Sequence, residues 1–167
     1  MLRLGRGLFL LLTGGLALLL LLTLGRLPAL VASHFDASGT PNGWSTRTGY
    51  AAVLLLVGAL LPLGVVALVG RLTRAGPQLL NIPSREYWRR PEHAEEAVRR
   101  ARAYVWWLAC IMAATGLAVH WLVLRANALQ PPRLATPGII AVLAGVLVAV
   151  SAWIVGWFRV LRPPVSG

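Results

Sequence analysis

Two histidines and one aspartate have the side-chain types of a metal or proton site. His34 and Asp36 are two residues apart in a polar stretch, and His120 lies near the end of a later apolar run. Two imidazoles and one carboxylate can bind a zinc-like ion, and an open coordination position would permit hydrolysis. The alternative, which we favour, is structural: His34 and Asp36 organise their own turn, while His120 bonds a backbone carbonyl or a Ser or Thr side chain. No cofactor is therefore predicted, and a metal ion at these three residues is the weaker alternative.

The stretch that contains His34 and Asp36 also has the composition of a recognition surface. Proline presets φ and Asn-Gly accepts positive φ, so residues 41–43 predict a turn, and Gly39 adds a second point of backbone freedom. A histidine, a carboxylate, hydroxyls and two aromatic rings surround these turns. The candidate ligand- or partner-binding residues are His34, Phe35, Asp36, Gly39, Pro41, Asn42, Trp44 and His120.

The other polar residues give weaker evidence for a functional site. Glu92, His93 and Glu96 could approach one another on a helix, but di-metal bundles need further carboxylates from other helices, and no apolar run carries one. We expect a solvated helix start there. Cys110, the only cysteine, excludes an intramolecular disulfide. No nucleophile elbow, phosphate loop or zinc-protease motif is present, so no catalytic residue is predicted.

Four apolar runs must position these residues. The chain has 167 residues, of which 57% are hydrophobic and 13% charged. Residues 7–25, 50–70, 103–124 and 138–158 are nearly free of charge, and each is close to the roughly 20 residues that cross a bilayer core. We therefore predict an all-α polytopic membrane protein, with the whole chain, 1–167, forming one domain of four transmembrane helices packed as a bundle.

The arginines predict how the bundle is oriented. All 16 basic residues are arginine, and twelve of them lie before the first run, between the second and third, or after the fourth. By the positive-inside rule both termini (N-in/C-in) and loop 71–102 lie in the cytoplasm, while loops 26–49 and 125–137 face outward. Because the net charge of +11 follows these loops, it indicates contact with lipid headgroups and no nucleic acid.

Local patterns add detail to two helices. Pro91 suits the first turn of a helix, and Glu95–Arg99 and Glu96–Arg100 are favourable i,i+4 pairs, so an amphipathic cytoplasmic helix is expected to continue into the third span. On that span a face of small residues runs up to His120, which should therefore point into the bundle. This face comprises Trp106, Ala109, Ala113, Gly116 and His120.

Two motifs resemble a known family. The pattern His34-Phe35-Asp36-x-x-Gly39-x-Pro41-x-x-Trp44, preceded by Leu27-Pro28, resembles the motif of the membrane family DUF1648. A companion cytoplasmic motif of that family is similar to residues 81–92, through Asn81, Pro83, Tyr87, Trp88 and Glu92. The family forms the N-terminal part of SdpI-like proteins, which give immunity to a secreted killing peptide and relay its presence inward. The resemblance implies a bacterial cytoplasmic (inner) membrane protein and supplies no catalytic residues.

Two function classes follow. The first is a non-enzymatic membrane module whose outer loop, residues 34–44, senses or binds a peptide, lipid or partner protein. The second is a small membrane enzyme or metal-binding carrier with its site at His34, Asp36 and His120. We favour the first. The expected partners are the lipid bilayer and a protein or peptide, and a stripe of small residues on the last span (Ala141, Gly145, Ala149) suits either the internal bundle or a homo-oligomer.

Overall fold

The structure is a computed structural model that describes residues 2–75 and 82–163. In chain order its elements are α1 (Leu2–Thr23), the short 3-10 helix η1 (Leu24–Arg26), β1 (Leu30–Phe35), β2 (Pro41–Thr46), α2 (Arg47–Leu55), the π-helical turn η2 (Leu56–Leu60), α3 (Leu61–Ala75), α4 (Arg85–Arg89), α5 (Pro91–Asn127) and α6 (Thr136–Val160). The chain is mostly helical, as predicted. The two-stranded antiparallel sheet formed by β1 and β2 departs from the all-α prediction.

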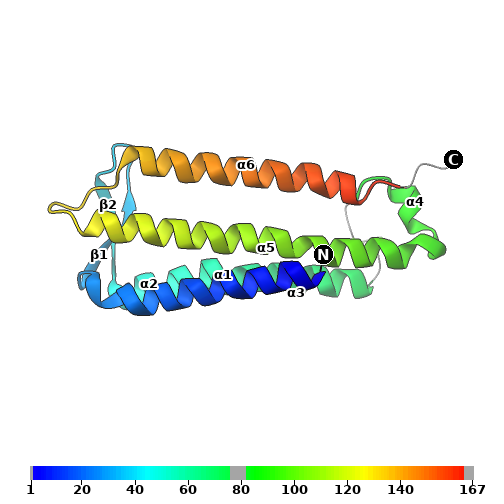
Figure 1. The fold of residues 1–167 in the computed structure, drawn as a ribbon, viewed down its shortest axis with the longest axis horizontal. Coiled ribbons are helices and arrows are strands. Elements are labelled where there is room, and N and C mark those ends of the chain that lie inside the picture. The colour runs from blue at the N-terminus through cyan, green and yellow to red at the C-terminus, as the bar shows by residue number, and fades with distance from the viewer. Residues whose placement is uncertain (1, 76–81, 164–167) are drawn as a thin grey trace.

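In the part of the chain that the structure describes, four helices are long and apolar enough to cross a membrane. They comprise Leu2–Arg26, Arg47–Arg74, Pro91–Asn127 and Thr136–Val160, and each contains one of the four predicted runs. They run side by side, with the sheet at one end of the bundle and α4 at the other (Figure 1). Large apolar side chains such as Leu21, Leu143 and Leu147 are exposed along the outside, as expected for a surface that meets lipid.

The second of these helices is continuous from α2 to α3 but contains the π-helical turn η2. Pro62 is the second residue after this turn. Proline has no N–H and its ring crowds the carbonyl four residues earlier, and a π-turn is one way in which a helix relieves that conflict. Gly58, within the turn, is buried against α1: a Cβ there would lie 2.6 Å from Cδ2 of Leu16. The irregular turn therefore lies at a point of close approach to α1.

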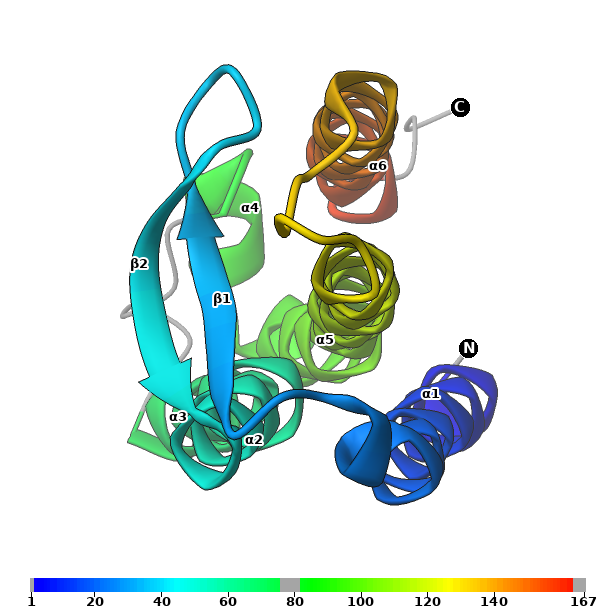
Figure 2. The ribbon, with the colours of Figure 1, turned by 90° about the vertical axis from the view of Figure 1, so that its left-hand side faces the viewer.

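Helix α5 is the centre of the bundle. It packs against α1, α3 and α6, and it also contacts β1 and α4. Seen from the end that carries the hairpin of β1 and β2, α6 lies on one side of α5, and α1 and the α2–α3 helix lie on the other (Figure 2). The predicted small-residue face is confirmed, since Ala109, Ala113 and His120 are completely buried. Helix α5 also begins at Pro91 and continues through the third span without interruption.

Helix α6 is the least enclosed of the four. It has no buried residue along its length. Its aromatic side chains Trp153 and Trp157 pack against Tyr104 of α5, with ring centroids 5.6 and 6.0 Å from the tyrosine. An apolar cavity of about 940 Å³ lies between α6, α5 and α1, and the small residues Ala141, Gly145 and Ala149 line it.

Candidate functional site

The tip of the hairpin is a turn built around Asp36. The Oδ1 atom of Asp36 accepts hydrogen bonds from the Ser38 amide at 2.8 Å, the Ser38 hydroxyl at 2.7 Å and the Thr40 amide at 2.9 Å. Gly39 has φ of +82°, in the left-handed region that favours glycine. The Ser38 hydroxyl, with the Thr40 and Ser38 amides, holds the pKa of the Asp36 carboxyl below its usual range. The expectation that Asp36 organises its own turn is confirmed.

The turn predicted at residues 41–43 is wrong. These residues begin β2, and the reversal of the chain lies at residues 36–40 instead. The carboxylate bonds of Asp36 and the positive φ of Gly39 fix the turn there, while Pro41 occupies the first position of an edge strand, where a missing N–H is tolerated. Gly43 has another role: it lies opposite His34, and a Cβ there would be 2.9 Å from Cβ of His34.

Three sets of contacts hold the hairpin against the bundle. The side chain of Asn127, at the end of α5, accepts a hydrogen bond from the Ala32 amide at 2.9 Å and donates one to the Ala32 carbonyl at 3.0 Å. At the tip, the Leu134 amide donates to the Gly39 carbonyl at 2.9 Å. At the base, the guanidinium of Arg47 donates to the Leu27 carbonyl. The hairpin is therefore fixed at its base, middle and tip.

The exposed surface of the hairpin carries several of the predicted binding residues. His34, Asn42 and Trp44 are exposed, and Trp44 has 49% of its surface accessible. Phe35 instead packs against the buried cluster that contains Val31 and Tyr50. The hairpin thus presents an imidazole, an amide and an indole outward while its other face is attached to the bundle.

Beneath the hairpin lies a buried polar network. The hydroxyl of Thr23 donates to the Leu19 carbonyl at 2.6 Å, so it accepts the proton of His120 Nε2, 2.8 Å away. The other ring nitrogen, Nδ1, then accepts from the Tyr50 hydroxyl at 3.0 Å. This assignment makes His120 a neutral imidazole with both nitrogens satisfied, which joins α1, α2 and α5. The expectation that His120 points into the bundle and bonds a Ser or Thr is confirmed.

The structure does not bring His34, Asp36 and His120 together as a metal site. Within residues 2–75 and 82–163, no group of three His, Cys, Asp or Glu side chains could hold a metal ion. His34 lies beside Ser33 on the hairpin, Asp36 is bound within its turn, and both ring nitrogens of His120 are engaged inside the bundle. The enzyme or carrier hypothesis therefore has no shared site in the described part of the chain.

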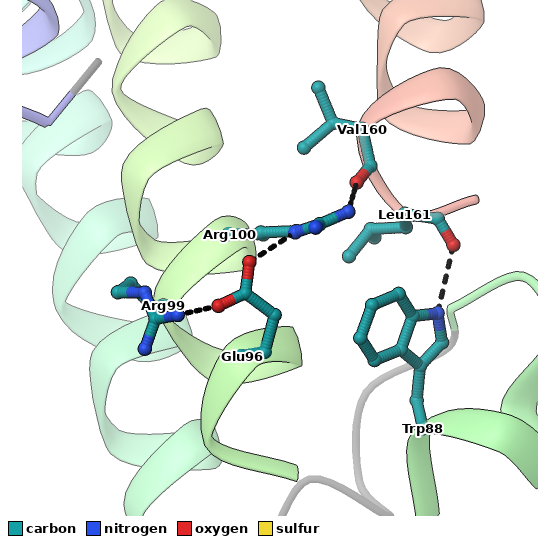
Figure 3. Close-up of polar contacts among 6 residues, drawn as sticks. All are labelled: Trp88, Glu96, Arg99, Arg100, Val160 and Leu161. Carbon is teal, nitrogen blue, oxygen red and sulfur yellow. Dashed lines mark hydrogen bonds and ion pairs between the residues drawn. The ribbon is translucent and has the colours of Figure 1, made fainter. Parts of the chain in front are cut away.

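The opposite end of the bundle contains the companion motif. Trp88 of α4 is buried, and its indole N–H donates to the Leu161 carbonyl at 2.8 Å (Figure 3). Arg100 donates to Glu96 at 2.6 Å and to the Val160 carbonyl at 2.8 Å. Helix α4, the first turns of α5 and the end of α6 are thereby joined.

The remaining motif residues have simpler surroundings. Tyr87 stacks on His93 with ring centroids 4.0 Å apart, whereas Glu96 pairs with Arg99 and Arg100. Pro83 is half-buried and Glu92 is exposed, whereas Asn81 lies outside the described residues. The predicted pair Glu96–Arg100 is confirmed, but Arg99 pairs with Glu96 instead of Glu95.

Comparison with known proteins bears on the segment that contains the hairpin. Residues 10–61 match the family model DUF1648. The description of that model is a domain of unknown function. The DUF1648 segment covers most of α1, the whole hairpin, α2 and η2, and so it includes Thr23 and Tyr50 of the buried network. No curated protein and no solved structure matches the chain.

Sequence reasoning missed several of the residues that position the hairpin. Asn127 at the end of α5 and Leu134 in the loop between α5 and α6 hold the hairpin. Tyr50 completes the network around His120. A polar amide at the end of a long apolar run was a usable signal for Asn127, because such a side chain near a membrane interface must find partners. Leu134 donates through its backbone amide, a group that every residue except proline carries.

Proposed function

We propose that this chain is a non-enzymatic multi-pass membrane protein that binds an extended peptide or peptide segment at its hairpin. Binding of the peptide shifts the hairpin, and α5 transmits this shift to α4 and the end of α6. In the proposed orientation the hairpin is on the outer face of a bacterial cytoplasmic membrane, and α4 is in the cytoplasm. The excess of arginine at the α4 end supports this orientation.

The proposal rests on a difference in backbone hydrogen bonding between the two edges of the hairpin. On the β1 side, the amide and the carbonyl of Ala32 are both hydrogen-bonded to the side chain of Asn127. On the β2 side, no hydrogen bond joins the backbone of residues 42–45 to a described residue outside β1. Strand β2 lies on the far side of β1 from α5 (Figure 2).

An open strand edge of this kind selects for an extended chain. A peptide that adds to a sheet edge gains main-chain hydrogen bonds, and exposed side chains beside the edge supply specificity. Trp44 and Asn42 project from β2 and are exposed. An indole supplies a large apolar contact area with one hydrogen-bond donor. A peptide therefore fits this edge better than a metal ion or a small polar substrate.

The path for a relay is the single helix α5. Its end holds the hairpin through Asn127, and its first turns hold Val160 through Arg100. The same helix supplies His120 to the buried network beneath the hairpin. Because a continuous helix moves as one element, a shift of the hairpin against Asn127 also displaces the contacts at the other end.

Native mass spectrometry of the whole protein, extracted gently from its own membrane and combined with elemental analysis, tests the binding proposal. We expect a peptide bound at a defined stoichiometry, which Trp44→Ala removes. Trp121→Ala is the matched control, because Trp121 is 50% exposed near the same end but belongs to α5. It should leave the bound peptide unchanged.

Two results would contradict the proposal. One is a stoichiometric transition metal that His34→Ala or His120→Ala removes, which would favour the metal-site alternative. The other is a bound peptide that Trp121→Ala removes as completely as Trp44→Ala, which would place binding away from the hairpin.

A further inference from the structure

A basic pocket lies at the end of the bundle opposite the hairpin. It has a volume of about 590 Å³ and is formed by the start of α1, the end of α3 and the first turns of α5. Its polar lining consists of Thr73, Arg74, Glu95, Arg99 and Arg102. The hairpin function does not use any of these side chains.

Arg102 is held in place within this pocket. Its Nε donates to the Thr73 hydroxyl at 2.7 Å, and its Nη2 donates to the Gly70 carbonyl at 3.2 Å. The Thr73 hydroxyl in turn donates to the Val69 carbonyl at 2.8 Å. These bonds fix the guanidinium plane between α3 and α5, and its Nη1 group makes no hydrogen bond to a described residue. A fixed guanidinium with a remaining donor suits a phosphate oxygen.

The charge balance of the pocket favours an anion. Arg74 is exposed and forms no hydrogen bond or ion pair with any residue in the described ranges. Arg99 already pairs with Glu96, and Glu95 contributes one negative charge at the rim. Glu96 shares its single negative charge between Arg99 and Arg100, and the positive charges of Arg74 and Arg102 alone exceed the single charge of Glu95.

The position of the pocket indicates which anion it meets. The second membrane-length helix ends at Arg74, and the uncharged stretch of α5 starts after Arg102. The pocket therefore lies where the apolar part of the bundle ends, at the level of lipid headgroups. Leu2 and Val98 add apolar surface to its lining. Basic pockets between transmembrane helices are suited to phospholipid headgroups.

We propose that this pocket binds the headgroup phosphate of an anionic phospholipid, with Arg74 and Arg102 contacting the phosphate oxygens. The proposal is independent of the hairpin function, because it depends on the other end of the bundle. It is tested on the full chain in detergent by native mass spectrometry, with phosphatidylglycerol and phosphatidylcholine of the same acyl chains as probes.

We expect phosphatidylglycerol to bind more tightly than phosphatidylcholine, and Arg74→Gln to weaken phosphatidylglycerol binding about fivefold. Arg74→Gln carries the test, since Arg74 makes no bond within the described structure and its loss should not disturb folding. Arg102→Gln should weaken binding at least as much. Arg159→Gln is the control: it removes the same charge from an exposed site at the end of α6, outside the pocket, and should change affinity less than twofold.

Three outcomes would overturn the proposal. Equal affinity for the two lipids would show that the headgroup charge is not recognised. An equal loss with Arg159→Gln and Arg74→Gln would show that overall charge, rather than the pocket, attracts the lipid. Displacement of phosphatidylglycerol by millimolar inorganic phosphate, with the same dependence on Arg74, would assign the pocket to free phosphate instead of a lipid.

Discussion

The directions of the hydrogen bonds around His120 determine its role in the bundle. Because Thr23 gives its own proton to Leu19, the imidazole must donate from Nε2 and accept at Nδ1 from Tyr50. All three polar side chains are then satisfied inside an apolar bundle, where an unpaired group is costly. The network is therefore a structural link between three helices.

Removing the Tyr50 donor tests this link. Tyr50→Phe leaves Nδ1 of a buried imidazole without a partner, and we expect it to lower the free energy of unfolding by about 1 kcal/mol. Unfolding of the purified protein by titration with a denaturing detergent measures the change. The triple variant Thr23→Val, Tyr50→Phe, His120→Leu should recover much of the loss, because no buried polar group then lacks a partner. A single variant as stable as the wild type would refute the assignment.

The turn at Asp36 gives a prediction for pH. Donors from Ser38 and Thr40 lower the pKa of Asp36 in the folded chain, so the stabilisation of the turn is complete above the ordinary value of 3.8 and is lost as the pH falls through the lower, folded pKa. Asp36 is the only aspartate, so its carboxyl carbon gives one distinct signal in an NMR titration. We expect a midpoint below 3.8, which Ser38→Ala should raise. A wild-type midpoint at or above 3.8 would contradict the turn geometry.

The long helices and the hairpin differ in how well the sequence predicts them. The four long helices could be predicted because uncharged runs of membrane length leave few other solutions. The hairpin could not, because its position depends on contacts between residues far apart in the sequence, such as Asn127 with Ala32. Its turn was misplaced because the local preference of residues 41–43 was weaker than the carboxylate bonds of Asp36. The predicted binding residues were otherwise in the correct segment, although Phe35 turned out to be a packing residue.

Gly39 should be the most sensitive position of the hairpin. Gly39→Ala places a Cβ at a positive φ, which costs about 1–2 kcal/mol, and directs it against the backbone carbonyl of Leu134. We expect faster amide hydrogen exchange at residues 36–40 and at Leu134. Gly25→Ala is the matched control, because a Cβ there meets no atom within 4 Å. If both variants show the same amide exchange as the wild type at these residues, the hairpin tip is not fixed to the loop between α5 and α6.

The orientation of the bundle is a prediction at the whole-molecule scale. Twelve of the 16 arginines lie in the segments predicted to be cytoplasmic. In intact cells a membrane-impermeant maleimide should therefore label Ala37→Cys at the hairpin tip and spare Glu92→Cys at the start of α5. Both positions are exposed, while the native Cys110 is buried. Labelling of Glu92→Cys alone would reverse the proposed orientation.

The proposed function requires α5 to couple the hairpin to α4. Amide hydrogen exchange of the full chain in lipid nanodiscs tests this coupling by comparing the wild type with Asn127→Ala. Because this change removes both bonds to Ala32, we predict faster exchange in residues 30–46 and also in α4, residues 85–89. Asn42→Ala, an exposed change on the same hairpin, should alter neither segment. Faster exchange in the hairpin with an unchanged α4 would contradict the coupling.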